Sequence, residues 1–198
     1  MTEGIPASSE ELFELFGTGS WVFLPAAPVR AIAAELGAVV VDERFSWGDN
    51  PHLGEGGRIV VLTAPMNGWM LLHGASETVG AAAAELSERR DVYRAMIDVR
   101  LPAMSWAYLE GGMPVRTVSV ELGDDGDLVT RTAGDPLPFE RDGALGAGAP
   151  HGLDSFFYPL AVLGEHGVTL DELRRGLGLP SVTLRIGRPD SGAAPSRP

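Results

Sequence analysis

The four histidines are the first residues to consider for metal or acid–base chemistry. No two of them have the three- or four-residue spacing that puts two imidazoles on one helix face. The densest set of ligand atoms is Asp49-Asn50-Pro51-His52, and a hydrogen-bonded turn explains those side chains about as well. We therefore expect no metal site and no cofactor. The histidines are His52, His73, His151 and His166.

Two carboxylates, Asp98 and Glu110, are candidates for a general acid and a general base. They act together only if neighbouring strands bring them to one place. With His73 they define an alternative site, a pocket between a sheet and its helices. Such a pocket suits a small-molecule-binding protein or a hydrolase-type enzyme. Charged groups on a half-exposed sheet more often face water, so we rank this interpretation second.

The chain shows no nucleophile in a recognisable catalytic setting. It has no cysteine, and no serine stands in a Gly-x-Ser-x-Gly elbow. The glycine-rich segment 17–20 lacks the lysine of a phosphate-binding loop and follows a predicted helix, whereas that loop follows a strand. We interpret it as a turn and favour a protein without catalysis.

A polar loop at 42–57 holds the best candidates for contact with a partner. Three of the four tryptophans fall in apolar runs typical of core strands, whereas Trp47 stands among polar residues. We predict that this loop engages a macromolecular partner. The contact residues would be Asp42, Phe45, Trp47, Asp49 and His52.

Charge limits the class of partner. The 198 residues include 27 acidic and 15 basic side chains, which gives a formal charge of −12, and every basic residue is an arginine. The arginines are not clustered as binding to DNA or RNA requires, so nucleic acid is not expected. The expected partner is a protein, and an acidic surface would steer a basic protein toward it. A homo-oligomer needs an exposed apolar patch, which the sequence does not locate.

Composition also bears on compartment and domain count. Without cysteine the chain forms no disulfide, and no run of about 20 apolar residues is present to span a membrane. The N-terminus lacks the basic and apolar regions of a signal peptide. We expect a cytoplasmic protein with one domain at 1–187 and a disordered tail at 188–198.

Helix and strand signals alternate in the first half of the chain. Asn67-Gly68 lies between two apolar runs, which is a strong hairpin signal. Ser76 is the expected N-cap of an alanine-rich helix. The predicted elements are helices at 8–17, 28–36 and 76–90 and strands at 21–24, 39–41, 58–63 and 69–72.

The second half predicts a β-meander followed by short helices. In the strand at 115–122, Val118 and Val120 alternate with polar residues, so one face of the sheet meets the core. Thr169 is the expected cap of a late helix. The predicted elements are strands at 92–99, 103–109, 115–122, 128–132 and 182–186, a loop at 135–150, and helices at 153–163 and 170–176. The fold class is α+β, a mainly antiparallel sheet with helices packed on one face.

Several short motifs follow one another at a recognisable spacing from Gly68 onward. They are a Gly-Trp hairpin, a Leu-Ser helix end, a Trp-Ala strand followed by Gly112 and Val115-Arg116, and the turn Gly134-Asp135-Pro136. In these motifs the chain resembles uncharacterised actinobacterial α+β proteins. The resemblance implies the same fold and an immunity-type or accessory role, and it brings no catalytic residues. The leading hypothesis is a non-catalytic protein-binding module, because the chain shows no catalytic constellation, its acidic residues are dispersed, and the loop at 42–57 carries aromatic side chains.

Overall fold

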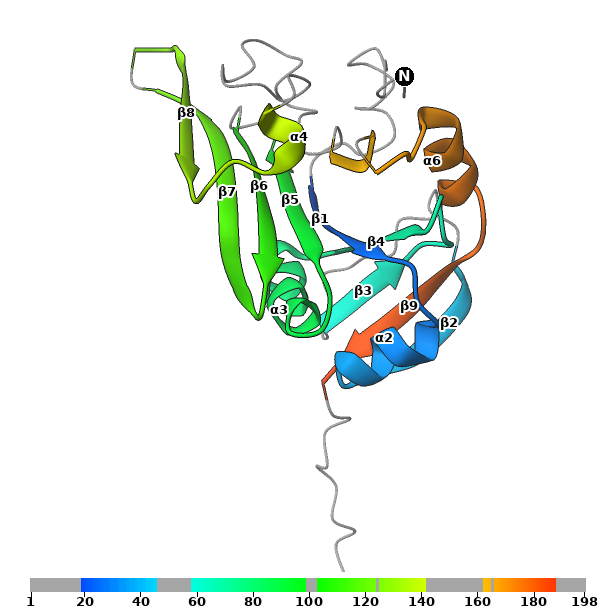
Figure 1. Cartoon of the computed structure of the whole chain (residues 1–198). Helices are drawn as coiled ribbons and strands as arrows, with labels where there is room; N and C mark the ends of the chain where they lie inside the picture. The colour runs from blue at the N-terminus through cyan, green and yellow to red at the C-terminus, as the bar shows by residue number, and fades with distance from the viewer. Residues whose placement is uncertain are drawn as a thin grey trace, which may run out of the picture.

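The computed structural model describes residues 19–45, 58–98, 103–123, 125–141, 162–164 and 166–187. In these residues nine strands form one sheet in the order β2-β9-β3-β4-β1-β5-β6-β7-β8 (Figure 1). All neighbouring strands are antiparallel. The strands are β1 (Gly19–Pro25), β2 (Ala38–Phe45), β3 (Arg58–Leu62), β4 (Trp69–Gly74), β5 (Val92–Asp98), β6 (Ala103–Glu110), β7 (Met113–Leu122), β8 (Leu128–Ala133) and β9 (Ser181–Ile186).

Each face of the sheet has its own apolar core. On β1, Val22 and Leu24 join one cluster, whereas Trp21 and Phe23 join the other, as alternation along a strand requires. Figure 1 shows α2 (Val29–Glu35) and α3 (Ser76–Ser87) below the sheet, with α4 (Pro138–Arg141) and α6 (Leu170–Leu177) above it. We call the upper side the α6 face.

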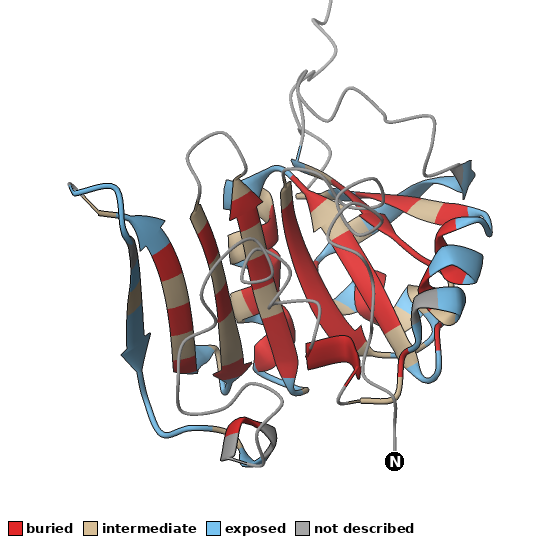
Figure 2. Ribbon diagram, turned by 90° about the horizontal axis from the view of Figure 1, so that it is seen from above, coloured by how far each residue is buried: buried red, intermediate tan, exposed pale blue. Residues whose placement is uncertain are grey.

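The fold is mixed helix and strand with a predominantly antiparallel sheet, as predicted, but helices on one face are not confirmed. Leu173 and Leu177 of α6 pack in the cluster of Trp21, whereas Leu86 of α3 packs in the opposite cluster. The physical reason is that the central strands are apolar on both sides and need cover on both. Figure 2 shows this as buried residues on the central strands and exposed residues along the outer strand β8.

The hairpin and the meander are confirmed. Asn67 and Gly68 both have positive φ, +44° and +80°, as a two-residue hairpin turn requires. This turn joins β3 to β4, and Leu62 of β3 pairs with Leu72 of β4. Strands β5 to β8 pair in sequence order. The last predicted strand is β9, which lies between β2 and β3.

The two expected helix caps have different outcomes. Thr169 caps α6 as predicted: its Oγ1 accepts from the Glu172 N–H at 3.2 Å, and its own N–H donates to Glu172 Oε2 at 2.9 Å. Ser76 is instead the first residue of α3, and the N-cap is Ala75, which has no side-chain acceptor. The prediction of a serine cap was therefore wrong.

Two predicted loops contain regular structure. Strand β2 continues through Asp42 to Phe45 because β9 still pairs with it beyond a bulge. Helix α4 forms at Pro138–Arg141, inside the loop expected at 135–150. The predicted helix at 8–17, most of the one at 153–163 and the tail at 188–198 lie outside the described residues.

Candidate functional site

A row of three side chains crosses β5, β6 and β7 on the α6 face. The register places Tyr93 opposite Tyr108, and Tyr108 opposite Arg116. Directly opposite residues point to the same face of a sheet, and Tyr93 packs in the α6-face core. The three side chains therefore lie next to one another on this face.

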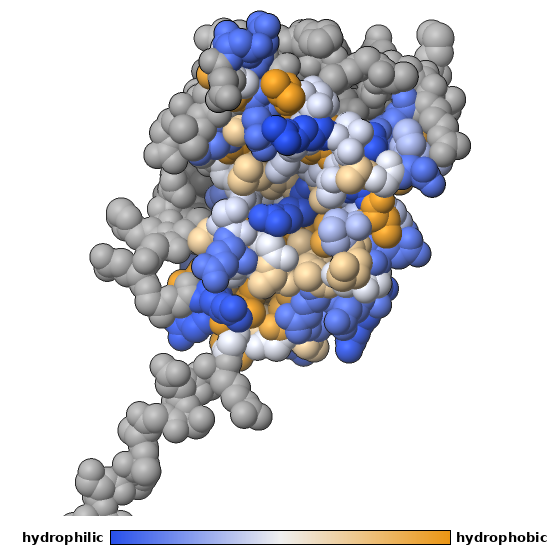
Figure 3. Space-filling model, turned by 90° about the vertical axis from the view of Figure 1, so that its left-hand side faces the viewer, coloured by the Kyte–Doolittle hydropathy of each residue, from blue (hydrophilic) through white to orange (hydrophobic). Residues whose placement is uncertain are grey.

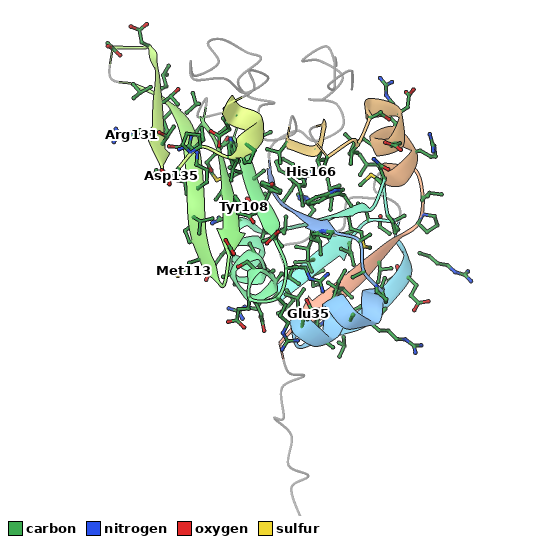
Figure 4. The ribbon with its side chains drawn as sticks, in the orientation of Figure 1. Glu35, Tyr108, Met113, Arg131, Asp135 and His166 are labelled. Atoms are coloured by element: carbon green, nitrogen blue, oxygen red, sulfur yellow. The ribbon has the colours of Figure 1, made fainter. Side chains whose placement is uncertain are left out.

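The two tyrosines of this row lie beside two further rings. We call the four rings the aromatic cluster: Trp69, Tyr93, Tyr108 and His166. The His166 ring centroid lies 4.3 Å from that of Trp69 and 5.4 Å from that of Tyr93. The two tyrosine rings are 5.1 Å apart. Tyr93 is 6% exposed and the other three side chains are partly exposed. Figure 4 labels Tyr108 beside β6 and His166 near the segment that precedes α6.

His166 is held over the sheet by its own turn. The Asn67 side-chain amide donates to the Gly167 carbonyl at 2.7 Å, which ties this turn to the β3–β4 hairpin. Gly167 has a φ of +76°, and a Cβ there would lie 2.8 Å from Asn67 Nδ2, so glycine suits both the conformation and the space. The hairpin that presents Trp69 thus also positions His166.

Burial keeps the two inner polar groups of the cluster neutral. His166 Nε2 lies 3.1 Å from the Tyr93 hydroxyl, within hydrogen-bond distance. Burial lowers the pKa of His166 below its usual 6.5 and raises the pKa of Tyr93 above its usual 10. At neutral pH the pair is an imidazole and a phenol without net charge.

The outer edge of the cluster is acidic. The Tyr108 hydroxyl donates a hydrogen bond to the Asp91 carboxylate, and Glu110 lies close enough to act on the same phenol by its charge. Burial, followed by the charge and hydrogen bond of Asp91 and the charge of Glu110, raises the pKa of Tyr108 to about 12. Asp91 and Glu110 are both exposed. This edge therefore combines a partly exposed aromatic ring with two solvent-accessible carboxylates.

Arg116 does not neutralise that edge because it is fully engaged with another acid. It is 6% exposed, and its Nε donates to Glu140 Oε1 at 3.1 Å while its Nη2 donates to Oε2 at 2.6 Å. Its Nη1 also donates to the Gly134 carbonyl at 2.9 Å. Two motifs of the sequence, Val115-Arg116 and Gly134-Asp135-Pro136, are thus parts of one clamp that holds α4 against β7.

A second histidine lies deeper on the same face. His73 stacks on Trp21, with ring centroids 5.6 Å apart, and its Nδ1 lies 2.9 Å from the Ser20 carbonyl. Because a carbonyl only accepts, Nδ1 carries the proton. Burial lowers the pKa of His73, and the hydrogen bond to Ser20 offsets part of that effect.

The alternative catalytic set is not brought together. Asp98 pairs with Ala103 at one end of the β5–β6 hairpin, whereas Glu110 lies seven residues farther along β6, about 23 Å away at roughly 3.3 Å per residue. His73 is aligned through Trp21 with the middle of β5. The structure therefore does not bring these three residues together, because an antiparallel hairpin separates the residues at its two ends.

Little of the predicted contact loop falls within the described residues. Asp42 is exposed on β2, where its Oδ1 accepts from the Arg44 N–H at 2.9 Å. Trp47, Asp49, His52 and the side chain of Phe45 lie outside the described residues. The contact surface proposed for this loop stays a prediction.

Sequence reasoning missed the aromatic cluster. One signal was present: residues 93 and 108 are equidistant from the midpoint between the strands predicted to begin at 92 and end at 109, so a hairpin of those two strands would place Tyr93 opposite Tyr108. The sequence predicts that Trp69 lies in the core but does not show which rings it contacts. For His166 no local signal exists, because it reaches Trp69 only through the tertiary contact with Asn67.

No family model, curated protein or solved structure matches the chain. The likeness to actinobacterial α+β proteins therefore stays a prediction. Among the described residues, no helix has the length and apolar character needed to cross a membrane. In that same part of the chain, His, Asp and Glu side chains do not gather in groups of three or more suited to a metal ion.

Proposed function

We propose that the protein is a non-catalytic binding module that takes a cationic group of a basic protein partner at the aromatic cluster. The observation that carries this proposal is the edge at Tyr108. There a partly exposed ring is hydrogen-bonded to Asp91 and lies near Glu110. The group bound would be a lysine ammonium or an arginine guanidinium.

Two attractive forces act on a cation at this edge. The face of an aromatic ring attracts a cation by about 0.5–2 kcal/mol, depending on how far the cation is desolvated. An exposed carboxylate adds roughly 0–1 kcal/mol as an ion pair. The rings of Tyr93 and Trp69 behind Tyr108 keep the site apolar on its inner side. A guanidinium, which is planar and weakly hydrated, suits such a surface better than an ammonium.

The charges around the cluster favour a cation over an anion. Arg116, which lies opposite Tyr108 on the neighbouring strand, already has Glu140 as its partner. His166 and the tyrosines are neutral near pH 7, because burial shifts the pKa of each away from that pH. A formal charge of −12 on the whole chain supports long-range attraction of a basic protein.

The proposal agrees with the immunity-type or accessory role expected from the sequence. It relocates the contact from the loop at 42–57, where no side chain beyond Arg44 is described, to the sheet face. The predicted cytoplasmic location is part of the same proposal.

The test is the binding of a short peptide that carries two arginines, measured by calorimetry and by the change in tryptophan fluorescence. The same peptide with glutamine in place of arginine is the ligand control. Tyr108→Leu should weaken binding about fivefold or more, which corresponds to about 1 kcal/mol. Asp91→Asn should weaken binding by up to about fivefold, because an exposed ion pair contributes at most about 1 kcal/mol.

Glu121→Gln is the matched control variant. Glu121 is exposed on β7, and its neighbour Val120 faces the α6 core, so Glu121 faces the opposite side of the sheet. The Glu121→Gln variant removes one negative charge, as Asp91→Asn does, and should leave binding unchanged. Equal weakening by Asp91→Asn and Glu121→Gln would reduce the effect to net charge and refute the site. Free arginine methyl ester, tested beside the peptide, separates a small-molecule ligand from a protein side chain.

A further inference from the structure

The edge strand β2 exposes an unusual run of apolar residues. Val39, Val40 and Val41 are 47%, 37% and 47% exposed. Elsewhere in the described residues, no three exposed large apolar side chains are consecutive. Successive residues point to opposite faces of a strand, so β2 is apolar and exposed on both of its faces.

The outer side of β2 has no strand beside it within the described residues. In the order of the sheet β2 is terminal, and β9 is its neighbour on the inner side. Edge strands in monomeric proteins usually carry charges or are covered, because their unpaired N–H and C=O groups attract another strand. The stretch Ala38–Val41 carries no charge.

The opposite edge of the sheet is protected in the usual way. On β8, the exposed Val129 is followed by Thr130 and Arg131, and Asp127 precedes the strand. Figure 3 looks at this side of the molecule and shows hydrophilic and neutral residues over most of the described surface, with hydrophobic residues scattered among them. The two edges therefore differ in kind, and an added strand is favoured only at β2.

The sequence of β2 is complementary to itself. In an antiparallel pair about a two-fold axis through Val40, Val40 faces its own copy and Val39 faces Val41. An axis through Val41 would instead place Val40 opposite Asp42 and Val39 opposite Glu43. An axis through Asp42 would place two Asp42 carboxylates opposite each other. Only the first arrangement keeps every valine against a valine.

The bulge in β2 limits the length of such a pair. The register with β9 shifts between Val40 and Asp42, and the Asp42 side chain accepts from the Arg44 N–H. A bulge bends the strand and ends regular pairing. Pairing is thus confined to Ala38–Val41 and the start of Asp42, which is where the valines lie.

We propose that two copies of this chain pair along β2, antiparallel about a two-fold axis through Val40, so that their sheets join into one. This surface is separate from the aromatic cluster, whose residues lie on β4, β5, β6 and the segment before α6, so the dimer stands whether or not the cluster binds a cation. Each copy carries a charge of −12, so the copies repel at long range and salt should strengthen the dimer by screening that repulsion.

Sedimentation equilibrium of the full chain tests the dimer directly. The wild type should show a monomer–dimer equilibrium that shifts toward dimer as salt is raised. Val40→Asp puts two carboxylates face to face and should raise the dimer dissociation constant at least about tenfold. Val129→Asp, on the other edge strand at 39% exposure, is the matched control and should leave it unchanged. A wild type that stays monomeric up to about 100 μM would have a dimer dissociation constant too weak for a specific dimer, and this result would overturn the proposal.

Disulfide crosslinking fixes the register. The chain has no cysteine, so a single introduced cysteine reports on one position. Directly opposite Cβ atoms lie about 4.5–5.5 Å apart, close to the span of a disulfide. Under mild oxidation Val40→Cys should form a crosslinked dimer, whereas Val129→Cys should not. A mixture of Val39→Cys and Val41→Cys proteins should crosslink to each other faster than either does to itself. Equal rates for all of these variants would rule out the proposed register.

Discussion

Two partly buried histidines link the stability of this protein to pH. Burial lowers the pKa of both His73 and His166 below the 6.5 of an exposed histidine. As pH falls through about 6.5, the unfolded chain takes up a proton that the folded chain resists, so the free energy of unfolding decreases. Their contribution is therefore fully present at higher pH and is lost on acidification.

Substitution of one histidine should remove part of this dependence. His73→Phe keeps a ring against Trp21 but cannot titrate. Between about pH 8 and pH 5.5, its free energy of unfolding should fall less than that of the wild type. Urea unfolding at the two pH values measures both differences. A variant that loses as much stability as the wild type would show that His73 is not a source of the effect.

At the same scale, removing only one partner of the buried ion pair Arg116–Glu140 should destabilise the protein. Arg116→Met leaves Glu140 buried without a counter-charge, and we expect a loss of about 3–5 kcal/mol in the free energy of unfolding. The double variant Arg116→Met/Glu140→Leu removes both charges and should recover most of that loss. If the double variant is as unstable as the single one, the loss arises from packing rather than from the unpaired charge.

At the scale of the element, helix α6 depends on its cap and on one hairpin. Thr169→Ala removes the acceptor of the Glu172 N–H and should lower the free energy of unfolding by about 1 kcal/mol. Thr169→Ser keeps the acceptor and should be close to the wild type. Chemical unfolding of the two variants provides the comparison, and equal losses would contradict a role for the cap.

The contact of α6 with the sheet explains why a glycine stands inside the helix. A Cβ on Gly176 would lie 2.2 Å from Met66 Cγ, so the helix can approach the β3–β4 hairpin only with glycine there. The same hairpin holds the turn of His166 through Asn67. The position of α6 and the geometry of the aromatic cluster therefore depend on a single hairpin.

At the scale of the whole molecule, β9 joins the two ends of the chain. It lies between β2 and β3, and Val60 and Val40 both face Leu184 in the register. Leu184 is fully buried. Leu184→Ala should lower the free energy of unfolding by about 2–5 kcal/mol, and hydrogen exchange should show the loss of protection reaching β2. Exchange that stays unchanged in β2 would show that β2 is held without β9.

Neighbouring strands joined by short turns could be predicted from the sequence. The Asn67-Gly68 turn fixes β3 against β4, and the alternation of Val118 and Val120 fixes the buried face of β7. The cap of α6 is likewise a local signal, because Thr169 and Glu172 are three residues apart. These features follow from interactions between residues close in sequence, so no knowledge of the fold is needed.

Only the tertiary structure decided which distant elements meet. The places of β1 between β4 and β5 and of β9 between β2 and β3 depend on packing across the whole chain, which local patterns do not encode. For the same reason helix α4 appeared in a predicted loop, held by Arg116 across 24 residues, and His166 met Trp69. By itself the sequence determined an acidic, cysteine-free, mainly antiparallel α+β chain. The structure decided where its aromatic, charged and apolar groups come together.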